Sequence, residues 1–450
     1  MANTNRSNLS YWSITVAVAG FLFGFDTVVI SGANLPIKEL WNTTPFFHGT
    51  FIMSMALWGT VVGALLGSIP MDKFGRKKTL FWIGLLFLAS ALGSAFAPDP
   101  YSFSFFRFIG GVGVGASSLA APAYISEIAP KSKRGRMVAL YQFMLVFGIF
   151  IAFFSNYLLK GVGGVNDWRW MLGVEAIPAL LYCIMILGVP NSPRWLAIQG
   201  KDDEGALKVL RGLYDEQEAQ TVLAEIKADD LASSAATGET GLFSGKYSTP
   251  LTLAFILAFF NQLSGINFIL YYAPEILAKA GLAAKESLLN SISIGGVNLL
   301  FTMLGMVLID RLGRKQLMLI GSVGYIGGLA GVAWAFYAAA SPTVLLVFIL
   351  LFIASHAIGQ GAVIWVFISE IFPNKVRAFG QSWGCGTHWV FAAIITLLGP
   401  VVLDIFSVNP WPIFAFFAGM MVLQLLWVVF FMPETKGKSL EELERELVKT

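Results

Sequence analysis

Charged residues are scarce in this chain, and their scarcity decides its class. Asp, Glu, Lys and Arg make up 13% of the 450 residues, against about 25% in a typical soluble protein. Hydrophobic residues make up 56%, and mean hydropathy is +0.71. So few charges cannot cover a soluble surface of this size, which excludes an array of soluble domains and predicts a polytopic membrane protein. The net charge of +3 is too small to indicate a nucleic-acid partner.

Cysteine and histidine are rare as well. The two cysteines, Cys183 and Cys385, lie in separate apolar stretches, so neither a disulfide framework nor a metal site is expected. The three histidines show no ligand spacing, and no nucleophile–base pair or phosphate-binding loop stands out. We therefore expect no metal, no cofactor and no enzymatic activity.

Long apolar runs dominate the chain instead. Twelve of them are long enough to cross about 30 Å of hydrocarbon. They must be helices, because a backbone in lipid has to satisfy its own hydrogen bonds. The run after Arg6 is too long for a signal-peptide core and contains Asp26, so it is predicted as the first span. The twelve predicted spans are 11–34, 46–70, 79–97, 101–126, 137–159, 168–189, 250–274, 287–309, 316–339, 343–369, 378–404 and 410–432.

Lys and Arg collect in alternate loops between these spans. The strongly basic loops are 71–78, 131–136, 310–315 and 371–377. All of them fall on the side of the membrane that carries both termini. Because cytoplasmic loops carry the excess of positive charge, we expect both termini in the cytoplasm of a multi-pass protein of the cell membrane.

One long polar segment interrupts the spans, at 191–249. It contains two amphipathic helical stretches and ends in a linker at 232–249. The tail reads as a short helix, with Ser439 and Glu442 in the pattern of a capping box. The predicted parts are a six-helix half at 1–190, a cytoplasmic helical linker at 191–249, a second six-helix half at 250–432 and a cytoplasmic tail helix at 433–450.

An internal repeat relates the two halves. DKFGRKK at 72–78 recurs as DRLGRKQ at 310–316, and SEIAP at 126–130 recurs as SEIFP at 369–373. A shared preference for basic loops explains common Lys and Arg residues but not these whole strings. Six spans separate the members of each pair, so both lie on the same side of the membrane. The sequence therefore predicts an all-α membrane protein with twelve transmembrane helices in two six-helix halves, the major facilitator fold, with a small cytoplasmic helical bundle.

The repeated motifs place opposite charges at the cytoplasmic ends of spans. Glu127 and Glu370 end spans 4 and 10, and an arginine follows each of them seven residues later. We expect ion pairs among these groups to lock the halves at the inner face and to break on inward opening, alongside ordinary snorkelling of basic side chains. The predicted gate residues are Arg76, Glu127, Arg134, Arg194, Arg314, Glu370 and Arg377.

Three charged residues lie inside spans of the first half, where charge is costly and marks function. Asp26, Arg107 and Glu175 all lie roughly 9–12 Å below the outer ends of their spans, at 1.5 Å per helical residue. Two carboxylates that share one guanidinium suit a group that binds and releases a proton. A static structural ion pair is the alternative. The second half shows no comparable interior carboxylate in its sequence.

The second half instead places amides and aromatic residues near mid-depth. Amides both donate and accept, and aromatic rings cover the apolar face of a sugar, so their clustering favours a neutral polyhydroxyl ligand. Any one of them alone is more often a helix–helix contact, and His388 is alternatively a proton site. Gly265 is expected to break span 7 beside a cavity. The set comprises Asn261, Gln262, Asn267, Tyr271, Asn298, Trp365, His388 and Trp389 of the second half, and Gln142 adds an amide from span 5 of the first half.

Four strings carry a resemblance to a known family. NQLSGINFILYYAPEI (261–276), PAYISEIAPKSKRGR (122–136), PNSPRWL (190–196) and PETKGKSLEEL (433–443) resemble the sugar porter family of the major facilitator superfamily. The resemblance covers nearly the whole chain. It implies a monomer in the lipid bilayer with a monosaccharide site between the halves, at the residues above and at Phe23.

The first span resembles proton-coupled members of that family. GFDTVVISG (24–32) has Asp26 where facilitative members generally have Asn, and the resemblance makes Arg107 and Glu175 its partners. Four departures are Asn261 and His388 in the sugar site, the absence of prolines from GQGAVIW (359–365), and Asn191 where Glu is typical. These departures affect sugar identity, the span 10 hinge and the inner gate.

We therefore predict a proton-coupled symporter for a pentose or hexose that works by alternating access. A facilitative sugar uniporter with the same binding site and a polyol or inositol transporter are the alternatives. A drug antiporter is disfavoured because span 5 contains no proline, and a non-transporting sensor is disfavoured because the tail is short.

Overall fold

The computed structural model describes residues 2–130, 133–235, 245–373 and 376–448, and these residues form helices and connecting turns with no strand. Parts of the predicted basic loops (131–132 and 374–375) and of the predicted linker (236–244) lie outside the described residues. Within the described residues, eleven helical segments are long and apolar enough to span a membrane, and one bent pair brings the number to twelve. This agrees with the twelve predicted spans.

The first six spans contain eleven helical elements. They are α1 (Ala2–Trp41), α2 (Pro45–Phe47), η1 (His48–Met53), α3 (Met55–Leu66), α4 (Ser68–Phe74), α5 (Arg76–Phe96), α6 (Pro100–Ile128), α7 (Arg134–Leu159), η2 (Gly164–Asn166), α8 (Asp167–Gly173) and α9 (Ala176–Leu187). The polar segment forms α10 (Pro193–Ile198), α11 (Asp203–Arg211) and α12 (Glu216–Ala235).

The last six spans contain eight helices, and one more follows them. They are α13 (Ser248–Leu263), α14 (Ile266–Lys279), α15 (Ala284–Leu312), α16 (Arg314–Tyr337), α17 (Pro342–Ile358), α18 (Gln360–Glu370), α19 (Arg377–Ile405) and α20 (Trp411–Phe430). The tail helix is α21 (Leu440–Leu447), and its predicted capping box forms between Ser439 and Glu442.

Several spans are broken, which bends them around the centre of the molecule. Gly265 separates α13 from α14 with φ +82°, a left-handed conformation that L residues rarely adopt. Gly359 separates α17 from α18, so span 10 is interrupted although GQGAVIW lacks prolines. Span 6 is interrupted between α8 and α9, and Glu175 is the N-cap residue of α9.

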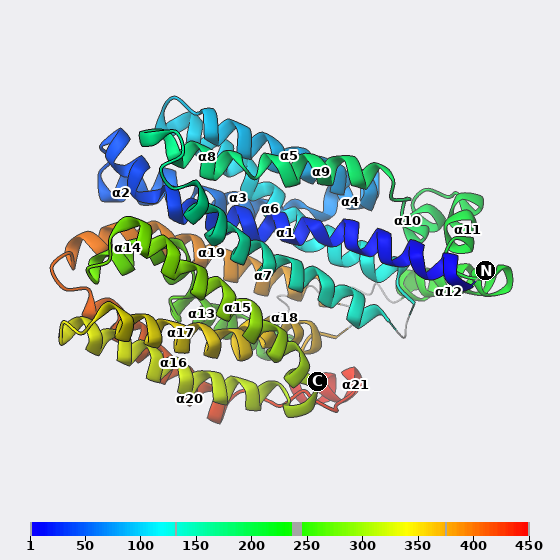
Figure 1. Ribbon diagram of the computed structural model, residues 1–450. Helices are drawn as coiled ribbons and strands as arrows, with labels where there is room; N and C mark the ends of the chain where they lie inside the picture. The colour runs from blue at the N-terminus through cyan, green and yellow to red at the C-terminus, as the bar shows by residue number, and fades with distance from the viewer. Residues whose placement is uncertain (1, 131–132, 236–244, 374–375, 449–450) are drawn as a thin grey trace.

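Both termini lie at one end of the bundle, together with α10, α11, α12 and α21 (Figure 1). We call this the terminal end and the other the distal end; odd-numbered spans begin at the terminal end. The α10–α12 bundle has its own small core, formed by Ala197, Ala206 and Ile226. It is joined to the first half by the indole of Trp195, which donates to the carbonyl of Asp72 at 2.9 Å.

Candidate functional site

A cavity of about 850 Å³ lies between the two halves. Its wall is formed by α1, α3, α4, α6 and α7 of the first half and by α13, α14, α15, α17, α18 and α19 of the second. It includes nine of the ten predicted sugar-binding residues, which are Phe23, Gln142, Asn261, Gln262, Asn267, Asn298, Trp365, His388 and Trp389. Both six-helix halves therefore contribute to one central compartment.

The cavity reaches the terminal end. Its wall there includes Ser68 on α4, Ser126 near the end of α6 and Gln381 near the start of α19. Gln381 is exposed. A solute of the size of a monosaccharide thus has a route between the cavity and the terminal end.

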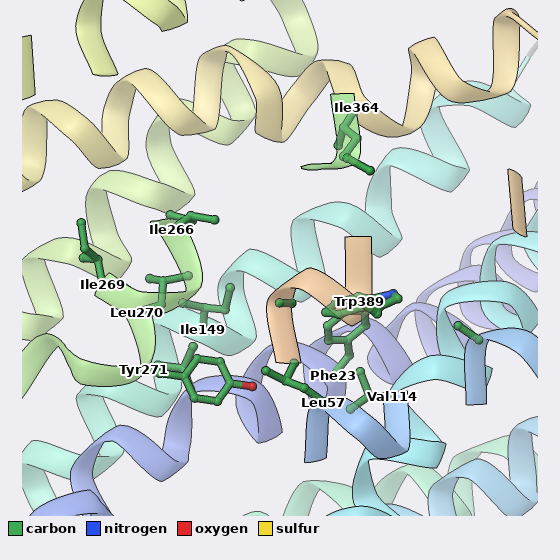
Figure 2. Close-up of a cluster of buried hydrophobic side chains, with 14 of the residues drawn as sticks. Phe23, Leu57, Val114, Ile149, Ile266, Ile269, Leu270, Tyr271, Ile364 and Trp389 are labelled. Carbon is green, nitrogen blue, oxygen red and sulfur yellow. The ribbon is translucent and has the colours of Figure 1, made fainter. Parts of the chain in front are cut away.

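The halves close on each other at the distal end. A Cβ atom on Gly49 of η1 would lie 1.9 Å from the carbonyl oxygen of Leu397 on α19, so these two backbones touch. Phe23 on α1 and Trp389 on α19 pack with ring centroids 5.7 Å apart, and Figure 2 shows them side by side. The molecule is therefore open at one end only.

The amide residues of span 7 form one hydrogen-bonded group around Gln262. Its Nε2 donates to Asn261 Oδ1 at 3.0 Å and lies 3.1 Å from His388 Nε2, while its Oε1 accepts from Asn267 Nδ2 at 2.7 Å. The His388 ring lies between Trp365 and Trp389, at centroid distances of 4.9 and 4.7 Å. Polar and aromatic surfaces thus meet at one wall of the cavity.

Tyr271 departs from its predicted role. It does not line the cavity, and only 1% of it is exposed. It interacts electrostatically with Arg107 and Asp26 instead. The reason is its position along α14: Tyr271 lies one helical turn beyond Asn267, which lines the cavity, and so lies about 6 Å nearer the distal end, beside the charged residues of the first half.

Asp26, Arg107 and Glu175 are brought together as predicted. Arg107 Nη1 donates to Asp26 Oδ1 at 2.5 Å, and Nη2 donates to the backbone carbonyl of Asp26 at 2.9 Å. Glu175, which is 1% exposed, interacts electrostatically with both. Asp26 Oδ2, Glu175 Oε1 and Arg107 Nε are buried, and among the described residues no side chain outside this group of three bonds to them. Two carboxylates face one cation, so one added proton would neutralise the group.

The predicted gate residues form two ion pairs, and each joins helices of a single half. Arg76 Nη2 lies 3.0 Å from Glu127 Oε1 in the first half, and Arg314 Nη2 lies 2.7 Å from Glu370 Oε1 in the second. Because the cavity opens between the halves at this end, no lock between the halves is expected in this state. The role of these glutamates as a gate therefore stays a prediction.

The other three predicted gate residues lie elsewhere. Arg134 is exposed and interacts electrostatically with Tyr214 of the polar segment. Arg194 is 3.9 Å from Asp229 in the α10–α12 bundle. Arg377 donates to the carbonyl of Phe372 at 3.3 Å.

The ion pair of the first half, Arg76–Glu127, lacks a second carboxylate that the ion pair of the second half, Arg314–Glu370, has beside it. In the second half, Glu434 accepts from the backbone amides of Arg314 and Lys315 at 2.9 and 3.0 Å. Partial burial opposes its ionisation, but these amides and those of Thr435 and Lys436 outweigh burial and lower the pKa of Glu434. The corresponding residue of the first half is Asn191, at the same offset as the SEIAP and SEIFP strings. The Oδ1 atom of Asn191 is buried and finds no hydrogen-bond partner among the residues that the structure describes.

A chain of hydrogen-bonded side chains at the distal end was not predicted from the sequence. Thr43 Oγ1 lies 2.8 Å from His48 Nδ1, His48 Nε2 lies 2.8 Å from Asn34 Oδ1, and Asn34 Nδ2 donates to Glu275 Oε2 at 2.8 Å. Glu275 lies on α14, so this chain joins the halves. It also corrects the expectation that the second half has no interior carboxylate, because Glu275 is only 8% exposed.

No group of three or more His, Cys, Asp or Glu residues that could hold a metal ion occurs in the described part of the chain. Cys183 and Cys385 are both free thiols there. The wall of the cavity offers hydrogen-bonding amides and aromatic rings.

Two six-helix halves around a central cavity that is open at one end define a secondary transporter of the major facilitator fold. A family model described as "Sugar (and other) transporter" matches residues 12–447. The chain belongs to this family.

Individual relatives agree over nearly the full length. The arabinose-proton symporter of Bacillus subtilis (strain 168) is 37% identical over 445 residues, which are 97% of this chain and 94% of that protein. The D-xylose-proton symporter of Escherichia coli (strain K12) is 34% identical, over 98% of this chain and 96% of that protein. A solved inward-open structure of the xylose transporter XylE from E. coli matches with a TM-score of 0.86 and 32% identity, over 98% of this chain and 100% of the other.

Proposed function

We propose that this protein is a proton-coupled monosaccharide symporter that works by alternating access, and that its structure here is the inward-open state. The observation that carries the proposal is the buried group of Asp26, Arg107 and Glu175 beside a cavity with an amide and aromatic wall. The relatives named above as proton symporters of arabinose and xylose support the same substrate class.

Different residues bind the sugar and the proton. The amides of span 7 offer donors and acceptors to sugar hydroxyls, and the indole rings of Trp365 and Trp389 cover its apolar face. The proton binds at Asp26, because Arg107 bonds to its Oδ1 and its backbone carbonyl and not to its Oδ2. Because Phe23 and Thr27 line the cavity on either side of Asp26 in α1, the two sites share one helix.

The orientation follows from the basic loops. We place the terminal end in the cytoplasm, since those loops lie beside both termini. The distal end then faces outside, and the cavity opens inward. We also propose that the chain divides into a first half at 1–190, a linker at 191–249, a second half at 250–432 and a tail at 433–450. The protein is proposed to be a monomer in the lipid bilayer.

One observation favours the uniporter as second candidate. Arg107 already holds Asp26 by two hydrogen bonds, one to the carboxylate and one to the backbone. A pair that never opens would be structural and would not carry protons.

Purified protein in proteoliposomes separates the two candidates. A panel of pentoses, hexoses and polyols, inositol included, is added outside, and external alkalinisation is recorded together with uptake of labelled solute. We expect one monosaccharide to drive alkalinisation in the wild type, and Asp26→Asn to exchange sugar without proton movement.

The matched control is Asp99→Asn, the same change at an exposed helix cap of the first half. This variant keeps the alkalinisation of the wild type. Sugar exchange without proton movement in the wild type would establish the uniporter, and polyol movement alone would establish the polyol transporter.

A further inference from the structure

A second buried hydrogen-bond chain leads from the interior of the second half to the cavity. Gln424 Nε2 donates to Ser322 Oγ at 2.9 Å, and Gln360 Nε2 donates to Gln424 Oε1. Tyr325 Oη donates to Gln360 Oε1 at 3.4 Å and lies 2.9 Å from His356 Nδ1. The first four residues are fully buried, whereas His356 lines the cavity.

The position of the His356 proton depends on where Tyr325 directs its single hydroxyl hydrogen. Gln360 Oε1 can only accept, and a Tyr325 hydroxyl that donates to it accepts a hydrogen bond from His356 Nδ1 in turn. In this arrangement Nδ1 of His356 is protonated. A neutral imidazole has only one N–H, which leaves Nε2 as a free acceptor.

The acceptor nitrogen is left uncovered by its neighbours. Gly361, which also lines the cavity, is so placed that a Cβ atom there would be 3.6 Å from His356 Nε2. A side chain at this position would therefore shield the nitrogen, and glycine leaves it accessible. In the described part of the chain, His356 makes its hydrogen bond through Nδ1, so Nε2 remains available to a solute.

We propose that His356 is a specificity-determining residue whose Nε2 accepts a hydrogen bond from one hydroxyl of the transported sugar. Tyr325 is its positioning residue, because it selects the tautomer that leaves Nε2 bare. This inference rests on the proposed sugar transport and names one contact within it. In this proposal α17 contributes a hydrogen-bond acceptor to sugar recognition, whereas the amides of span 7 offer both donors and acceptors.

A lone acceptor has a distinctive signature with sugar analogues. A hydroxyl donates to it, but neither fluorine nor hydrogen at the same carbon does. For one ring position we therefore expect both the deoxy and the fluoro analogue to compete about ten-fold more weakly than the parent sugar, the size of one lost hydrogen bond. In His356→Phe this penalty disappears at that position and persists at the others.

The experiment is competition of unlabelled analogues against labelled sugar in exchange across proteoliposomes. Ser355→Ala is the matched control, since this neighbouring hydroxyl bonds to the carbonyl of Leu351 in its own helix, and it keeps the wild-type pattern. Tyr325→Phe frees the tautomer of His356, so the fluoro analogue regains affinity while the deoxy analogue does not. This second variant carries the test if His356→Phe does not give folded protein.

The outcomes separate the two proposals. Wild-type protein that moves no monosaccharide refutes the proposed function. Wild-type protein that moves one, with the same analogue penalties in His356→Phe at every ring position, overturns the role of His356. A fluoro analogue that binds as well as the parent, where the deoxy analogue does not, overturns it too, since Nε2 would then be a donor.

Discussion

Replacing Asn34 by alanine tests how the distal end is kept closed. Asn34 Nδ2 donates to the carboxylate of Glu275 across the interface between the halves, at 2.8 Å, and both groups are buried. The variant leaves Glu275 without this donor and removes the acceptor of His48. When the distal end opens, water replaces the lost partners, so the cost falls on the closed state alone.

The magnitude follows from the charge of the acceptor. A hydrogen bond to a charged group contributes about 1.5–3 kcal/mol, and about 1.4 kcal/mol changes an equilibrium ten-fold. We therefore expect Asn34→Ala to move the equilibrium toward the outward-open state by roughly 10- to 100-fold. A protein that is 99% inward-open would, at the upper limit, become about half outward-open.

Spin-label distances at the distal end measure this shift. Val165 and Val408 are strongly exposed, one in each half, beyond the distal ends of α7 and α19. Labels on these positions, in protein without its native cysteines, gain a longer-distance population in Asn34→Ala. Asn290→Ala is the control, because the Asn290 side chain donates to the carbonyl of Glu286 in its own helix. Unchanged distances in Asn34→Ala, or an equal change in Asn290→Ala, would refute the reasoning.

Three further predictions concern stability, measured as the melting temperature in detergent. Gly265→Ala should lower it by forcing φ +82° on an L residue, at about 1–2 kcal/mol, and by placing Cβ 2.7 Å from the Phe417 ring, whereas Gly327→Ala, with open space around it, should not. Glu434 has a lowered pKa, so its stabilisation is present above about pH 4.5 and is lost as pH falls through its folded pKa; the deficit of Glu434→Gln at pH 7 should shrink on acidification. Asn191→Glu should raise the melting temperature by supplying the missing anion, and no rise would show that Asn191 is not the counterpart of Glu434.

The depth of a side chain in the membrane could be predicted from the sequence. A transmembrane helix rises about 1.5 Å per residue, so the number of residues from the end of a span gives the depth. The common depth of Asp26, Arg107 and Glu175 gave their contact correctly. The internal repeat also predicted the two halves. Six spans separate the two members of each repeated string, so both members lie on the same side of the membrane.

The partners of other buried side chains could not be predicted from the sequence. Tyr271 lies one helical turn beyond the cavity-lining Asn267 on α14, and it interacts with Arg107 instead of lining the cavity. The gate glutamates pair within their own halves in this state, which no spacing along the chain reveals. The bond from Asn34 to Glu275 spans 241 positions of sequence and exists only where the halves meet.

The proton site and the distal closure are carried by the same two helices. On α1, Asn34 follows Asp26 by eight residues, or about 12 Å of helix. On α14, Glu275 follows Tyr271 by one turn, so both lie on the same face of that helix. Tyr271 interacts with Arg107, and Glu275 bonds to Asn34. The proposed proton site and the contact that closes the distal end are therefore joined by one turn of α14 and about 12 Å of α1. On this arrangement we expect Asp26→Asn, which removes the charge, to change the distal spin-label distances in the same assay, and unchanged distances would contradict a connection through these two helices.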